Sequence, residues 1–139
     1  MPARILLDTS YLYGLMEAPG KLSSAEQDFL SDQSVRLYVS AVSIWEMRLK
    51  YHARTPSGKR KSPFDPHNVV AMLEEQGVIF LPMTGTHAAR ELETPISHRD
   101  PFDELLLVQA QEEGLRLLTA DRELSNHPLA VTVQDLPDQ

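Results

Sequence analysis

The chain has 139 residues, 42% of them hydrophobic and 24% charged, and this composition fits one globular domain with a real core. It contains no cysteine, which excludes disulfides and thiolate metal sites and leads us to expect a cytoplasmic protein. The net charge of −7 argues against nonspecific nucleic-acid binding through a basic face, and no apolar run approaches the roughly 20 residues that span a membrane.

Strands and helices are expected to alternate along the chain. In chain order, we expect a strand over 4–7, helices over 8–16 and 23–30, a strand over 35–39, helices over 41–52 and 66–76, a strand over 78–81, helices over 86–92 and 101–114, and strands over 115–118 and 130–133. Ser23 and Glu26 have the spacing of a capping box. Pro66 suits a first helical turn and Gly77 a helix end.

This alternation predicts parallel βαβ units with right-handed crossovers. The expected strands are continuous apolar runs, as in sheets that helices cover on both faces. We therefore expect a single three-layer α/β/α domain over residues 1–139, with a central, mostly parallel sheet.

Four carboxylates follow expected strands or begin the next helix: Asp8, Glu46, Asp103 and Asp121. In open α/β sheets that edge binds ligands. Two like charges about 4 Å apart cost roughly 4 kcal/mol at an effective dielectric near 20, so acids gathered there call for a cation. Carboxylates suit Mg²⁺ or Mn²⁺, whereas the five histidines lack the HxxxH spacing of a zinc site. A metal held in this way suggests phosphoester chemistry.

Asp8 and Glu46 also have purely structural interpretations. Asp8 can cap the helix that follows it. Glu46 can form a capping box with Ser43 if the helix begins there; if Ser40 is the cap, Glu46 lies deeper in the helix and needs another role.

The two later acids have structural interpretations as well. Asp100 resembles an N-cap followed by Pro101, which would place Asp103 at the third helical position, where it favours the helix dipole. Asp121 can be a turn residue.

Four segments also resemble a known family. In chain order they are LLDTS (residues 6–10), SAVSIWE (40–46), HRDPFDELLLVQA (98–110) and LRLLTAD (115–121). In this chain order they resemble the PIN domain, above all the VapC-type toxins of bacterial toxin–antitoxin pairs, across nearly the whole chain. Glu104 departs from the pattern, because an arginine is common there.

The resemblance implies an endoribonuclease that needs Mg²⁺ or Mn²⁺, a small antitoxin as partner, and a homodimer. It places the family's acidic positions at Asp8, Glu46, Asp103 and Asp121. Asp103 is preferred to Asp100 as a ligand because the Asp-x-Leu-Leu pattern follows it. Supporting roles are implied for Asp100, for Thr9 or Ser10, and for Thr119, with turn and cap chemistry as the alternative.

A basic stretch within this acidic chain is the candidate contact for the RNA backbone, the alternative being a solvated loop: Arg48, Lys50, His52, Arg54, Lys59, Arg60 and Lys61. Tyr11, Tyr13 and Trp45 lie near the acids in sequence and could stack on bases. For Trp45 we expect core packing instead, on an apolar helix face with Val42 and Leu49.

Other functions remain open. A haloacid-dehalogenase-type enzyme would need a second Asp where Ser10 stands, and a receiver domain would need an acid after the strand that ends at Leu81. A PIN-type nuclease that processes RNA outside a toxin pair, or that cuts DNA, would share the same acids. A non-catalytic binding module would have the same fold but no catalytic activity.

Overall fold

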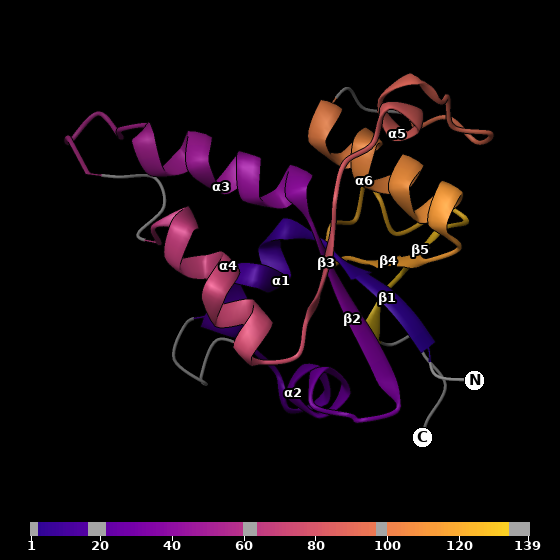
Figure 1. Cartoon of the computed structure of the whole chain (residues 1–139), viewed down its shortest axis with the longest axis horizontal. Helices are drawn as coiled ribbons and strands as arrows, with labels where there is room; N and C mark the ends of the chain where they lie inside the picture. Colours follow the sequence, from indigo (N-terminus) through magenta and orange to yellow (C-terminus); the bar gives the residue numbers. More distant parts are fainter. Residues whose placement is uncertain (1–2, 17–21, 60–63, 97–99, 134–139) are drawn as a thin grey trace.

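The computed structural model describes residues 3–16, 22–59, 64–96 and 100–133. Within them, five parallel strands form one sheet in the order β3-β2-β1-β4-β5. The strands are β1 (Ala3–Leu7), β2 (Val35–Ser40), β3 (Ile79–Leu81), β4 (Arg116–Leu118) and β5 (Ala130–Val131). The helices are α1 (Thr9–Met16), α2 (Ser24–Leu30), α3 (Ala41–His52), α4 (Pro66–Glu75), α5 (Gly85–Ala89) and α6 (Pro101–Glu113), as Figure 1 shows.

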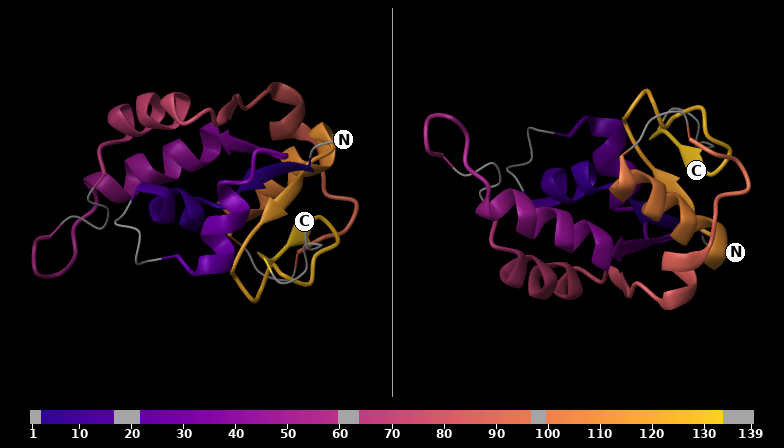
Figure 2. Two further views of the ribbon diagram at one scale, coloured as in Figure 1. Left: turned by 90° about the horizontal axis from the view of Figure 1, so that it is seen from below. Right: turned by 90° about the horizontal axis from the view of Figure 1, so that it is seen from above.

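The central strand β1 shows how the sheet divides the core. Ile5 and Leu7 belong to a buried cluster that contains residues of α1, α2 and α4, whereas Leu6 belongs to a second cluster built mainly from α6. Because successive side chains of a strand point to opposite faces, helices cover the sheet on both sides (Figure 2). The expected three-layer α/β/α fold with a parallel sheet is confirmed.

Local signals placed most helix ends correctly. Ser23 and Glu26 form the expected capping box at the start of α2. Asp100 caps α6 and Pro101 is its first residue, while Gly114 ends it in the left-handed conformation at φ 67°. Gly77 follows α4 at φ 80°, which a residue with a Cβ rarely adopts. No described helix combines the length and apolar character needed to cross a membrane.

The short helix α5 differs from its expected range of 86–92. It begins at Gly85, because Thr84 and His87 form a capping box, and it ends at Ala89. The following backbone bonds to α6 instead: Gln111 accepts from the N–H of Glu93 at 2.9 Å and donates to the carbonyl of Glu91 at 3.0 Å.

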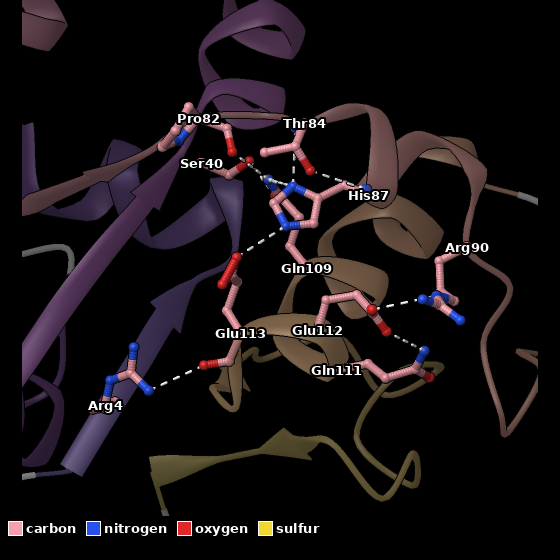
Figure 3. A network of polar contacts seen from close by, with 10 residues as sticks. All are labelled: Arg4, Ser40, Pro82, Thr84, His87, Arg90, Gln109, Gln111, Glu112 and Glu113. Carbon is pink, nitrogen blue, oxygen red and sulfur yellow. Dashed lines mark hydrogen bonds and ion pairs between the residues drawn. The ribbon is translucent and has the colours of Figure 1, made fainter.

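A buried polar network joins β2, α5 and α6 (Figure 3). Ser40, His87 and Gln109 are each at most 2% exposed. The Ser40 hydroxyl bonds to Oε1 of Gln109, whose Nε2 donates to the carbonyl of Pro82 at 3.4 Å. Nδ1 of His87 accepts from the N–H of Thr84 at 3.1 Å. Buried polar groups are costly unless they are paired in this way, so the network fixes the end of β2 against α6.

Candidate active site

The carboxyl ends of β1 and β4 lie side by side at the point where the strand order of the sheet reverses. The chain runs from β1 to β2 and β3 on one side, and β4 is then added on the other side of β1. The backbone N–H of Asp8, directly after β1, donates to the carbonyl of Leu118 at the end of β4, 3.1 Å away. Open α/β sheets bind ligands in the crevice beyond such a switch point.

Asp8 is a buried carboxylate at this switch point, with 8% of its surface exposed. The Thr119 hydroxyl donates to its Oδ2 at 2.7 Å. Burial raises the pKa of Asp8; the bonds from Thr119 and from the backbone N–H of Thr9 oppose the rise, and the charges of Glu46 and Asp121 add to it. An ionised Asp8 is therefore costly without a cation nearby.

Glu46 lies in the second turn of α3. Ser40 caps this helix, since its Oγ accepts from the N–H of Val42 at 2.9 Å, and a capping box between Ser43 and Glu46 is therefore excluded. The Thr9 hydroxyl lies 2.9 Å from Oε1 of Glu46 and also 2.9 Å from Oγ of Ser43. A carboxylate only accepts, so Thr9 donates to Glu46 and orients it.

Lys50 places a cation beside Glu46. Its Nζ lies 3.0 Å from Oε2 of Glu46, one helical turn earlier on α3. Burial lowers the pKa of Lys50, but the hydrogen bond to Glu46 and the charges of Glu46, Tyr13 and Asp100 outweigh this and raise it. Lys50 is therefore charged at neutral pH and offsets part of the local negative charge.

The first turn of α6 contributes two more acids. Oδ1 of Asp100 accepts from the N–H of Phe102 at 2.9 Å and of Asp103 at 3.4 Å, so Asp100 is a helix cap. Its position leaves Asp103 in the first turn, near the positive end of the helix dipole.

Asp121 lies in the turn that follows β4. Its N–H donates to Oγ1 of Thr119 at 3.0 Å, and its Oδ1 accepts from the N–H of Glu123 at 2.9 Å. The Thr119 hydroxyl therefore contacts both Asp8 and the backbone of Asp121.

These acids line one pocket of about 440 Å³, called the acid pocket below. Its lining residues are Asp8, Thr9, Ser10, Tyr13, Glu46, Lys50, Asp100, Asp103, Ala120 and Asp121. Residues separated by more than a hundred positions thus share one cavity, as the sheet topology predicts.

The acid pocket has the donor chemistry of a hard cation. Its lining contains carboxylates and hydroxyls but no histidine, which suits Mg²⁺ or Mn²⁺ better than zinc. Within the described ranges, however, no three acidic or histidine side chains converge closely enough to hold one ion. Lys50 instead pairs with Glu46 there. Metal binding would thus require small rotations of the carboxylates and of Lys50.

The basic stretch lies along the end of α3 and the turn after it. Arg48, Lys50, Arg54 and Lys59 are exposed, whereas Arg60 and Lys61 lie outside the described residues. In the turn, the N–H of Thr55 donates to the carbonyl of Lys59 at 2.8 Å. Lys50 is the one of these four described cations that lines the acid pocket.

The expectation that Trp45 packs in the core was wrong. Trp45 is 46% exposed and Leu49 is 44% exposed, while Val42, Ser43 and Met47 are the buried residues of α3. Met47 lies further along the helix than Trp45 and is still buried, so α3 packs through the side that carries Ser43 and Met47, and Trp45 and Leu49 lie off that side. The long helix α3 is seen in Figure 1.

Two features of the site were not foreseen from the sequence. One is the pairing of Lys50 with Glu46, for which the i,i+4 spacing was an available signal. The other is the buried Ser43 hydroxyl beside Thr9, which depends on how α1 and α3 pack and has no local signal.

Several solved structures have similar folds. A chain of a toxin–antitoxin complex from Klebsiella pneumoniae is 20% identical, with a TM-score of 0.62 over 95% of this chain and 99% of that one. A chain of DNA-bound VapBC from Salmonella typhimurium is 17% identical, with a TM-score of 0.58 over 94% and 96%. A chain of FitAB bound to an IR36 DNA fragment is 19% identical, with a TM-score of 0.56 over 97% and 99%. At these identities the likeness shows the fold.

No curated protein sequence matches the chain significantly. The family model of the PIN domain, in contrast, matches residues 5–128, and this range includes all four acids, from Asp8 to Asp121. The chain therefore belongs to the PIN domain family.

Proposed function

We propose that this PIN domain is a metal-dependent endoribonuclease and the toxin of a toxin–antitoxin pair. The observation that carries the proposal is the gathering of Asp8, Glu46, Asp103 and Asp121 around one pocket at the switch point of the sheet. These acids would hold one or two Mg²⁺ or Mn²⁺ ions, with Asp100 serving as a helix cap.

A bound metal would supply an activated water and stabilise the negative charge that develops on the phosphate. The residues of the chain orient this site. Thr119 fixes Asp8, and Thr9 fixes Glu46, through hydroxyl bonds of 2.7 and 2.9 Å. Because water attacks instead of the ribose 2′-hydroxyl, cleavage leaves a 5′-phosphate.

The basic stretch is the proposed contact for the RNA backbone. Besides Lys50, which pairs with Glu46, its described lysine and arginine side chains are those of Arg48, Arg54 and Lys59, and all three are exposed. Replacing all three by Gln should weaken RNA binding and reduce the slope of log affinity against log salt by about 2, since each phosphate contact to a single strand contributes about 0.7. An unchanged slope would remove them from the binding surface.

The proposed partners are an antitoxin protein and a second copy of the chain, in the cytoplasm. Support comes from similar solved structures, which are a toxin–antitoxin complex and the DNA-bound VapBC and FitAB. Co-expression with the product of an adjacent reading frame, followed by co-purification and sedimentation, tests both partners.

The direct test is cleavage of tRNA and ribosomal RNA with and without Mn²⁺. The wild-type chain should cut only with metal and leave 5′-phosphate ends, and Asp8→Asn should abolish cutting. Asp28→Asn, an exposed aspartate on α2, is the matched control and should cut normally. Wild-type cutting by Asp8→Asn would refute the proposed site.

A non-catalytic binding module is the second candidate, favoured by one observation. No three described acids converge on one point, and Lys50 already neutralises Glu46. Calorimetry with Mn²⁺ separates the two: heat of binding that is lost in Asp8→Asn supports the nuclease, and no binding to the wild-type chain supports the module.

A further inference from the structure

An exposed apolar surface lies on α3 beside the acid pocket. It consists of the exposed Trp45 and Leu49 and of the partly buried Phe102, and it is called the Trp45 surface below. Trp45 and Leu49 are 46% and 44% exposed and are one helical turn apart. Phe102, in the first turn of α6, packs edge-on against Trp45, with ring centroids 5.2 Å apart at an angle of 62°. Water contact with such large apolar groups is unfavourable, so a grouped set of them indicates a binding surface.

Leu49 and Phe102 connect the Trp45 surface to the acid pocket, whereas Trp45 itself lines a separate hollow together with Arg48. A neighbouring hollow of about 500 Å³ is lined by the apolar side chains of Leu49, Ala53, Pro101 and Phe102, and also by Glu46, Lys50 and Asp100. The last three residues line the acid pocket as well. A ligand that extends out of the acid pocket therefore meets Leu49 and Phe102 next.

The charges around this surface indicate what kind of ligand fits. Arg48 and Lys50 are exposed cations of the same helix, on either side of Leu49 in sequence. A ligand that alternates anionic groups with flat apolar rings would use both the cations and the aromatic rings. Single-stranded nucleic acid has this chemistry, because unpaired bases offer stacking faces that a duplex hides.

We infer that the Trp45 surface binds an unpaired nucleobase of the RNA next to the phosphate that enters the acid pocket. The inference rests on the proposed ribonuclease function and adds to it the residue that contacts the base. The base stacks on the exposed part of the Trp45 ring, and Leu49 and Phe102 enclose it.

Trp45 reports on this contact directly, because it is the only tryptophan in the chain. The probe is a hexamer of uridylate titrated into the Asp8→Asn chain in EDTA, so that no cleavage occurs. Its binding should quench or shift the emission of Trp45. The matched probe is an abasic ribose-phosphate hexamer, which should bind more weakly and leave the emission unchanged.

Variants separate stacking from folding. Trp45→Ala should weaken binding of the uridylate hexamer about 10-fold, whereas Trp45→Phe, which keeps an aromatic face, should lose much less. Met72→Ala is the control, because Met72 is an apolar residue of α4 that is 38% exposed and lies outside the Trp45 surface. It should bind like the parent chain, and thermal denaturation verifies that each variant is folded.

Each outcome decides the inference. If fluorescence anisotropy of a labelled hexamer shows binding while Trp45 emission and the affinity of Trp45→Ala stay unchanged, the nucleobase contact is refuted and the ribonuclease proposal stands. If Trp45→Ala instead lowers the molar mass in sedimentation with unchanged RNA affinity, a second copy covers the surface and the inference is refuted. If no RNA is bound or cut, both proposals fail.

Discussion

Nζ of Lys50 lies 3.0 Å from Oε2 of Glu46, so a cation of the chain itself occupies the edge of the acid pocket. The Glu46 side chain is only 15% exposed, and the pair is therefore less screened than a surface ion pair. Such a lysine makes the grouped acids tolerable without a metal, and it competes with a metal for Glu46.

Removing this competitor should tighten metal binding. Lys50→Gln is expected to bind Mn²⁺ about 5-fold more tightly, which corresponds to an ion pair worth about 1 kcal/mol. Arg48→Gln removes the same charge from the same helix but leaves the pair intact, and it should change the affinity much less. Calorimetry measures both. Equal affinities for Lys50→Gln and the wild-type chain would show that the pair does not compete with the ion.

The Thr119 hydroxyl is expected to be needed for activity. Thr119→Val removes the bonds to Asp8 and to the N–H of Asp121, and partners of this kind typically matter 10–100-fold in metal affinity or activity, so cleavage should fall by about that factor. Thr119→Ser keeps the hydroxyl and should retain most activity. Should both variants cut equally well, the hydroxyl has no orienting role.

Asp8 should cost stability when no metal is bound. Because its pKa in the folded state is raised, the folded chain favours the protonated form, and stability is lost as pH rises through the folded-state pKa. In EDTA at pH 7, Asp8→Asn should therefore melt about 2–6 °C higher than the wild-type chain. The difference should shrink as pH falls toward the ordinary value of 3.8. A variant that melts lower at pH 7 would contradict this account.

The side-chain amide of Gln109, in the buried polar network, is expected to contribute strongly to the stability of the fold. Gln109→Leu leaves the Ser40 hydroxyl and the Pro82 carbonyl without this partner, at an expected cost of about 1–3 kcal/mol. Gln111→Leu is the control on the same helix, because the bonds of Gln111 are exposed to water and are replaced at little cost. Urea denaturation measures both changes. Equal losses would mean that burial of Gln109 does not set its importance.

The sequence predicted the features that depend on interactions between residues close together in the chain. The Asp100 cap and Pro101 define the start of α6 through preferences of single residues, and both are confirmed. Parallel order was also predictable, because alternating strands and helices allow few other connections. The acids could be expected at one edge because each follows a strand or lies early in a helix there.

The sequence did not predict the features that depend on how elements distant in the chain pack against each other. The spacing of Val42, Trp45 and Leu49 identifies one side of a helix, but it does not reveal that α3 packs through a different side, the one that carries Ser43 and Met47. The end of α5 was likewise set by Gln111, a side chain of another helix. Both errors concern contacts that only the assembled layers create.

The bond between Thr119 and Asp8 has a consequence for synthesis, because it joins residues 111 positions apart. Because Asp8 precedes β4 in the chain, β1 at the centre of the sheet lacks one neighbour until β4 has been made. The acid pocket therefore stays incomplete until translation has passed Asp121. Any activity of this pocket would begin only after β4 and the turn that carries Asp121 have been made.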